Sequence, residues 1–149
     1  MDKPIWFGSV DLRQLNETHA SDVNGHLGIE VTEYGDDWLA GRMPVDRRTT
    51  QPYGILHGGA SVLLAETLGT AAANFTVDPA QFICVGQEVN ANHLRSVRKG
   101  YVHGRARPFH LGRTAQVWGI ELRDDDDRPT CVARLTVAVL PRLADKPRA

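Results

Sequence analysis

The longest run of apolar and small residues in the chain lies at about 58–75, and Glu66 is the one ionisable residue inside it. A helix that is apolar on every side is normally buried in the core of a protein. The pattern therefore predicts a long buried helix over about 58–75. Asp78 and Pro79 follow, and a proline at this place marks the end of the helical region.

Residues on both sides of this helix alternate between apolar and polar, which is typical of strands. Two strands are predicted before the helix and four after it, at 27–34, 38–45, 82–95, 101–109, 113–123 and 131–140. Glycine-containing turns at 35–37 and 99–100 separate neighbouring strands. A short helix is predicted over 9–18, where Val10, Leu12 and Leu15 are the apolar positions.

The order of these elements favours an α+β fold, because strands that are clustered in sequence tend to pair antiparallel. The long helix is too apolar for an open surface, so the simplest architecture is a curved antiparallel sheet wrapped around one central helix. The chain shows no repeat, low-complexity linker or domain boundary. We expect a single domain over 1–149 with its core at about 20–140.

Length and charge narrow the possible partners. The chain has 149 residues, the size of one domain, and a net charge of −1, which gives no general attraction to nucleic acid or acidic membranes. The N-terminus lacks the apolar core of a signal peptide, and no apolar run is long enough to span a bilayer. We expect a cytoplasmic protein without nucleic-acid or membrane partners.

Two further features of the sequence have simple structural interpretations. Cys84 and Cys131 are far apart in strand-like runs, which predicts reduced core residues. The four consecutive aspartates at 124–127 predict a solvated hairpin turn and not a metal site, because carboxylates in one tight turn cannot all face one ion. The tail after Pro141 is expected to fray.

The helix at 58–75 also carries candidate chemistry. A carboxylate buried among apolar residues is costly unless it has a partner or a role, and Glu66 has no basic residue within one turn. Gly58 and Gly59 open the helix, where free backbone N–H groups collect. A carboxylate that attacks or acts as base, and N–H groups that polarise a carbonyl, together suggest acyl chemistry.

These residues resemble a known family. The pattern Gln51-Pro-x-Gly-x-x-His57-Gly58-Gly59, followed by Glu66 in a helix of small residues, resembles the hotdog-fold acyl-CoA thioesterases. The resemblance is strongest to the branch of phenylacetate-pathway, 4-hydroxybenzoyl-CoA and 1,4-dihydroxy-2-naphthoyl-CoA thioesterases. Segments 43–47, 88–96, 108–113 and 116–118 match the same branch, so the likeness covers roughly 20–140.

The resemblance implies a role for each residue of the motif. Glu66 would be the catalytic carboxylate, either a nucleophile or a general base, and the Gly58 N–H would polarise the thioester carbonyl. Gln51 would orient the thioester or the water. His57 would take part in the chemistry or only hold the loop, and Thr70 would orient the carboxylate or only pack.

The resemblance also implies a path for coenzyme A. Val85 would lie near the thioester arm, and two basic segments would line the pantetheine and nucleotide portions. These segments comprise Asn92, His93, Leu94, Arg95 and Ser96, and then His110, Leu111, Gly112 and Arg113. Arg105 and Arg107 are better interpreted as solvated strand residues.

Helix geometry adds an argument about assembly. Gly58 and Glu66 are separated by about 12 Å along a helix axis at 1.5 Å per residue, whereas reacting atoms must come within roughly 3–3.5 Å. Both residues serve one site only if two antiparallel helices from two chains lie side by side. We therefore expect a homodimer with shared sites, and the resemblance implies a homotetramer built as a dimer of dimers.

Together these features predict hydrolysis of an acyl-CoA without metal or cofactor. The resemblance favours an aromatic acyl group, first 1,4-dihydroxy-2-naphthoyl-CoA and hence menaquinone biosynthesis. A broad-specificity housekeeping acyl-CoA thioesterase remains an alternative, as does a non-catalytic hotdog protein that binds acyl-CoA or an acyl carrier. The joint presence of Gln51, Gly58 and Glu66 argues against the non-catalytic alternative.

Overall fold

The structure is a computed structural model, and it describes residues 3–142. Its helices are α1 (Leu12–His19), α2 (Val23–Leu27) and α3 (Gly58–Phe75). Its strands are β1 (Glu30–Tyr34), β2 (Leu39–Pro44), β3 (Phe82–His93), β4 (Tyr101–Leu111), β5 (Ala115–Asp124) and β6 (Pro129–Pro141). The strands form one antiparallel sheet in the order β1-β2-β4-β5-β6-β3.

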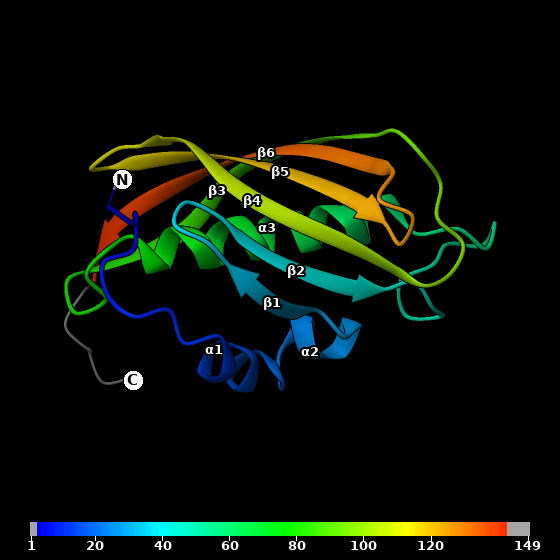
Figure 1. The fold of residues 1–149 in the computed structure, drawn as a ribbon, viewed down its shortest axis with the longest axis horizontal. Helices are drawn as coiled ribbons and strands as arrows, with labels where there is room; N and C mark the ends of the chain where they lie inside the picture. The colour runs from blue at the N-terminus through cyan, green and yellow to red at the C-terminus, as the bar shows by residue number, and fades with distance from the viewer. Residues whose placement is uncertain (1–2, 143–149) are drawn as a thin grey trace, which may run out of the picture.

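The sheet curves around α3, which runs lengthwise through its hollow (Figure 1). The α1–α2 segment lies beyond β1, at one side of α3, and β3 forms the opposite edge of the sheet. The predicted α+β architecture, a curved antiparallel sheet around one long central helix, is confirmed. The predicted helix at 58–75 is also confirmed, and its bounds follow from the His57 N-cap and the Thr76 C-cap.

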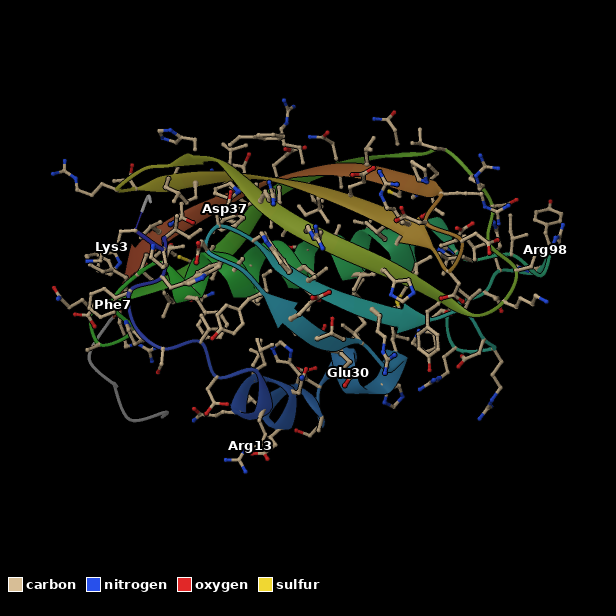
Figure 2. The ribbon with its side chains drawn as sticks, in the orientation of Figure 1. Lys3, Phe7, Arg13, Glu30, Asp37 and Arg98 are labelled. Carbon is tan, nitrogen blue, oxygen red and sulfur yellow. The ribbon has the colours of Figure 1, made fainter. Side chains whose placement is uncertain are left out.

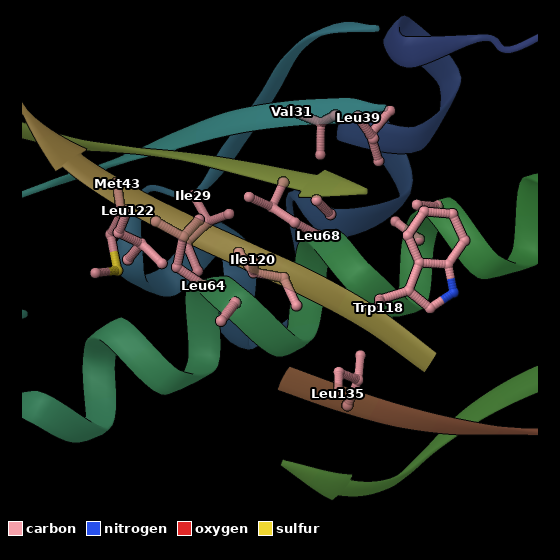
Figure 3. Close-up of a cluster of buried hydrophobic side chains, with 14 of the residues drawn as sticks. Ile29, Val31, Leu39, Met43, Leu64, Leu68, Trp118, Ile120, Leu122 and Leu135 are labelled. Carbon is pink, nitrogen blue, oxygen red and sulfur yellow. The ribbon is translucent and has the colours of Figure 1, made fainter. Parts of the chain in front are cut away.

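The core lies between α3 and the concave face of the sheet (Figure 3). Leu64 and Leu68 of α3 are fully buried there. Gly41 and Gly104 are paired across β2 and β4, and a Cβ atom on either would meet a Leu68 methyl group, at 2.8 Å and 2.6 Å respectively. The two glycines therefore let α3 approach the sheet more closely than larger residues would.

The N-terminal third differs from the sequence prediction. The strand expected over 27–34 begins only at Glu30, and a short helix, α2, precedes it. The Asp22 side chain accepts a hydrogen bond from Asn24 N, which caps the start of α2. Gly28 ends α2 in the left-handed conformation with φ 71°, which glycine adopts without strain. These local caps outweigh the weak alternation on which the strand prediction rested.

The acidic turn is only partly solvated, which corrects the expectation for 124–127. Asp124 ends β5 and is 7% exposed, while the next three aspartates are exposed. Arg128 donates to the Asp124 carboxylate from its backbone N and from Nε. These bonds lower the pKa of Asp124. Arg128 thus compensates for the burial of this carboxylate.

Three other expectations concern the two cysteines, the C-terminal tail and membrane-spanning segments. Cys84 and Cys131 are buried free thiols, as predicted. The predicted fraying of the tail concerns residues that, from Leu143 onward, lie outside the described part. Across residues 3–142, no helix has the length and apolar character needed to cross a membrane.

The packing of α3 predicts a large effect on stability. We expect Leu68→Ala to lower the free energy of unfolding by about 2–5 kcal/mol, because it leaves a cavity in a fully buried site and the two glycines opposite have no side chains that could fill it. Leu140→Ala is the matched control, since Leu140 is 42% exposed, and it should cost less than about 1 kcal/mol. Urea denaturation measures both, and equal losses would contradict this account of the core.

Candidate active site

The loop between β2 and α3 is fixed by hydrogen bonds before it reaches the helix. Thr49 is 1% exposed, and its hydroxyl donates to Pro44 O at 2.7 Å. Arg48 donates to the Asp46 carboxylate and lowers the pKa of Asp46 to about 2. Gln51 N donates to Ile55 O at 2.9 Å, which closes the turn that carries Gln51. Gln51 therefore lies in a turn that backbone hydrogen bonds hold in place.

The same loop ends at the N-cap of α3, where one backbone donor is free. His57 Nδ1 accepts from Gly59 N at 2.8 Å, and His57 O accepts from Ala60 N and Ser61 N. Within residues 3–142, the Gly58 N–H has no hydrogen-bond partner. An unpaired N–H at the start of a helix is the donor that a developing oxyanion requires.

This geometry gives His57 a structural role. Because Nδ1 accepts a hydrogen bond, the neutral ring carries its hydrogen on Nε2. The ring is exposed, so Nε2 stays available to a ligand. The cap hydrogen bond agrees with the role of holding the loop, and both roles considered for His57 stay predictions.

A groove of about 1300 Å³ runs along the face of α3 that the sheet leaves uncovered. Its floor is α3, one wall is the start of β3, and the other wall is formed by α1, α2 and the segment before them. Glu66, Thr70 and Val85 all line this groove. The structure thus brings three of the predicted site residues together.

Glu66 is not fully buried in the single chain, which corrects the expectation drawn from its apolar neighbours. It is partly exposed at the floor of the groove, because the sheet covers only the opposite face of α3. Gly86 of β3 lies directly against the carboxylate, and a Cβ atom there would overlap Glu66 Oε1. Gly86 therefore gives the carboxylate the space in which it lies.

Thr70 occupies the next turn of the same face. Its hydroxyl oxygen is buried and has no hydrogen-bond partner within residues 3–142. A buried hydroxyl that packs only would normally bond to a nearby backbone carbonyl. The free hydroxyl favours the first of the two roles considered for Thr70, which is orienting the carboxylate or a water molecule.

A thiol also lines the groove, so it must be weighed as a second nucleophile. Burial raises the pKa of the Cys84 thiol to about 11, so it stays protonated near neutral pH. Asn74 of α3 also holds the backbone at Cys84, donating to Cys84 O and accepting from Cys84 N at 2.9 Å each. Cys84 is therefore part of the frame, and Glu66 is the better candidate for the chemistry.

The two segments predicted to bind coenzyme A, 92–96 and 110–113, lie at opposite ends of the folded domain. His93 is beside Gly58, since a Cβ atom on Gly58 would lie 2.8 Å from His93 Nε2. Through the pairing of β5, β6 and β3, Ala115 lies level with Val85. His93 is about 26 Å farther along β3, at about 3.3 Å per residue.

The figures show the same separation. Arg113 lines a small cavity together with Phe7, and Phe7 and Arg98 lie at opposite ends of the molecule (Figure 2). The segment at 92–96 is exposed and close in sequence to Arg98, and His110 and Leu111 are exposed at the end of β4. One chain therefore does not form a single path from these two segments.

Comparison with known proteins identifies the family. Residues 53–131 match the family model described as the thioesterase superfamily. The 1,4-dihydroxy-2-naphthoyl-CoA hydrolase of Escherichia coli (strain K12) is 47% identical over 136 residues, which are 91% of this chain and 99% of that protein. The chain belongs to the thioesterase superfamily. It is a thioesterase with the hotdog fold.

Two other relatives of this thioesterase support the assignment. Proofreading thioesterase EntH of Cronobacter turicensis is 48% identical, and the match covers 91% of this chain and 98% of that protein. A crystal structure of mutant thioesterase PA1618 from Pseudomonas aeruginosa superposes with a TM-score of 0.91 at 51% identity. That match covers 93% of this chain and 99% of the other.

Several residues of the thioesterase groove have no signal in the sequence. Asn74 and Gly86 act through contacts with β3 and with Glu66, and neither belongs to the motif around His57. Asn24 and His19 line the opposite wall, and Asn24 contacts Thr67 across 43 positions of sequence. Such contacts depend on how distant segments fold together, so spacing does not reveal them.

The contact between Gly86 and Glu66 predicts an effect on turnover. Gly86→Ala should lower kcat by about 10-fold or more, because the new methyl group displaces the carboxylate, and a shift of about 1 Å in a reacting group costs up to 10²-fold. Gly8→Ala is the matched control, since a Cβ atom there meets nothing within 4 Å. Thiol release and thermal unfolding should be measured for both. A kcat for Gly86→Ala equal to that of the control would show that Gly86 does not position Glu66.

Proposed function

We propose that this thioesterase hydrolyses an aromatic acyl-CoA to the free acid and coenzyme A, with 1,4-dihydroxy-2-naphthoyl-CoA as the favoured substrate. The observation that carries the proposal is that one helix, α3, carries both an unpartnered N–H at its start, on Gly58, and a carboxylate on its uncovered face, on Glu66. The name of the Escherichia coli relative supports the aromatic acyl group.

The chemistry follows from these two groups. The Gly58 N–H donates to the thioester oxygen and stabilises the negative charge that develops there. Glu66 either attacks the carbonyl carbon, forming an anhydride that water then hydrolyses, or takes a proton from the water that attacks. In both routes the C–S bond breaks and coenzyme A leaves as a thiolate, which needs no metal or redox cofactor. Gln51 and Thr70 orient the reacting groups.

A complete site requires a second chain. In the structure α3 is a continuous helix from Gly58 to Phe75, so Glu66 stays about 12 Å along the axis from its own Gly58. Among the described strands, β3 has a partner on one side only, and its free edge is a template for another strand. Asn74 already occupies the edge at Cys84. Pairing is therefore expected beyond that point.

The contacts of β3 also suggest a register for the dimer. Gly86 lies beside Glu66, and His93 lies beside Gly58. An antiparallel pair of β3 strands centred between Val89 and Asn90 would place Gly86 of one chain level with His93 of the other. Glu66 would then face Gly58 of the other chain.

The same dimer would bring the two predicted coenzyme A segments together, one from each chain. An antiparallel pair brings the end of one sheet that carries Arg113 toward the end of the other that carries Arg95. Arginines at such a rim suit the phosphates of coenzyme A. We propose that the path is formed jointly by both chains, that the dimers assemble into a homotetramer, and that the enzyme acts in the cytoplasm.

A broad-specificity acyl-CoA thioesterase is the second candidate. The match to proofreading thioesterase EntH is as extensive as the match to the hydrolase, so the extent of the match does not choose between the two candidates. A panel of aryl-CoA and alkyl-CoA substrates, assayed for free thiol, distinguishes the two candidates. Selectivity for aryl groups supports the first, and similar kcat/KM across the panel supports the second.

Replacing the carboxylate tests the chemistry. Glu66→Gln should retain the fold and oligomeric state but lower kcat by at least ~10²-fold, because loss of a nucleophile or base commonly has an effect of that size. Thiol release from the best panel substrate measures kcat, while thermal unfolding and light scattering provide the controls. A kcat within a few-fold of wild type would remove Glu66 from the mechanism.

Subunit mixing tests the shared site. Glu66→Ala and Gln51→Ala chains are mixed and exchanged, and hybrid dimers are isolated by two different affinity tags. If each site takes Glu66 from one chain and Gln51 from the other, a hybrid has one site with both lesions and one intact site. The hybrid should then show about half of the wild-type turnover per dimer.

The opposite arrangement gives a distinct result. If each chain held its own complete site, every site of the hybrid would carry one lesion. Isolated hybrids that are no more active than the two parents would therefore contradict the shared-site proposal, while Glu66→Gln would still report on the chemistry.

A further inference from the structure

The two walls of the groove differ in chemical character. The β3 wall is mainly apolar at Phe82, Cys84 and Val85. The α1–α2 wall adds the polar residues Gln14, Thr18, His19 and Asn24 to the apolar Leu15 and Val23, and Thr67 is the polar residue of α3 that borders it. The polar wall lies across the groove from the contact between Glu66 and Gly86.

Asn24 is the central residue of the polar wall. It is 8% exposed, and its Oδ1 accepts from Thr67 Oγ1 at 2.6 Å. Its Nδ2 group has no hydrogen-bond partner within residues 3–142, although the residue lines the groove. Unlike His19 Nδ1, this Nδ2 atom is not fully enclosed, so it is open to the groove and can donate to an oxygen that a ligand brings.

His19 offers a second donor at the same wall. Its Nδ1 atom is buried and has no hydrogen-bond partner within residues 3–142. A buried orphan acceptor is tolerated better than a buried orphan N–H, so the neutral ring is expected to carry its hydrogen on Nε2. The ring lines the groove, and Nε2 is then the donor that it offers to a ligand.

The distance from Glu66 to this wall suits the length of an aryl acyl group. Glu66 and Thr67 are consecutive on α3, so their side chains diverge by about 100° around a helix whose diameter with side chains is about 10–12 Å. The tips of the two side chains are thus roughly 8 Å apart. If the thioester carbonyl lies at Glu66, an oxygen on the far side of an aromatic acyl ring comes within reach of Asn24.

We propose that Asn24 and His19 are specificity-determining residues whose N–H groups bind a hydroxyl or keto oxygen at the far end of the acyl group. This rests on the proposed thioesterase function at Glu66. An acyl group with such an oxygen satisfies both donors. A hydrocarbon acyl group of the same shape covers the donors without replacing their bonds to water, so it binds less well in the transition state.

The experiment compares 3- and 4-hydroxybenzoyl-CoA with benzoyl-CoA, using thiol release. For wild type, kcat/KM should be at least about 10-fold higher for one hydroxybenzoyl isomer than for benzoyl-CoA. His19→Phe should lower this ratio. The double variant Asn24→Leu/Thr67→Val should lower it at least about 10-fold, and it replaces both members of the hydrogen bond by apolar groups of similar size, so no buried partner is left unpaired.

Two further variants separate binding from structure. Arg13→Ala is the control, because Arg13 is exposed on the same helix as His19 and points away from the domain (Figure 2). It should leave the ratio unchanged. His19→Gln retains a side-chain donor and should restore part of the ratio that His19→Phe loses.

The outcomes distinguish this proposal from the function on which it rests. If wild type hydrolyses no acyl-CoA in the panel, the proposed function fails. If it hydrolyses them without preferring either hydroxybenzoyl isomer, the wall does not select an oxygen. If the variants lower kcat/KM equally for all three substrates, Asn24 and His19 only support the fold, and the proposal is overturned.

Discussion

Helix α3 is apolar around most of its circumference, and the sheet of one chain covers only part of it. Leu64 and Leu68 face the sheet and are fully buried, whereas Val62 and Leu63 remain partly exposed in the groove. Much of the remaining structure depends on this half-covered helix. The paired glycines of β2 and β4 let the Leu68 face of α3 pack closely against the sheet. The polar positions at Glu66, Thr67 and Thr70 lie on the other, open side of the helix.

Because α3 is one continuous helix, it also keeps the Gly58 N–H and the Glu66 carboxylate of one chain apart. The free N–H of Gly58 is fixed at the start of α3 by the His57 cap, and Glu66 is fixed two turns later by the regular rise of the helix. No side-chain rotation in a rigid helix removes that separation. The uncovered face, the free edge of β3 and the divided coenzyme A segments are therefore consistent with one another, since each lacks a neighbour that an antiparallel second copy would provide.

Some of this could be predicted from the sequence because the signals are local. The apolar run and the His57-Gly58 start set the bounds of α3, and alternation located most of the strands. The failures have the opposite cause. The five-residue helix α2 is too short to show a helical period, and the inward turn of Asp124 depends on Arg128. The partial exposure of Glu66 reflects which face of α3 the distant strands cover. The polar wall at Asn24 likewise exists only once the N-terminal segment packs beside α3.

The positions of these groups along the chain suggest how chemistry and selectivity can be separated. The family match at 53–131 includes Gly58, Glu66 and Gly86, so the parts with strict geometric requirements lie within the shared framework. Asn24 and His19 lie outside it, on helices that line the groove beside α3 but do not build its cap or its carboxylate site. If Asn24 and His19 select the acyl group as proposed, a substitution on the α1–α2 wall would change selectivity without moving the Gly58 N–H. In that proposal, the half-covered helix provides one face for bond cleavage and an adjoining wall on which acyl selectivity can be set independently.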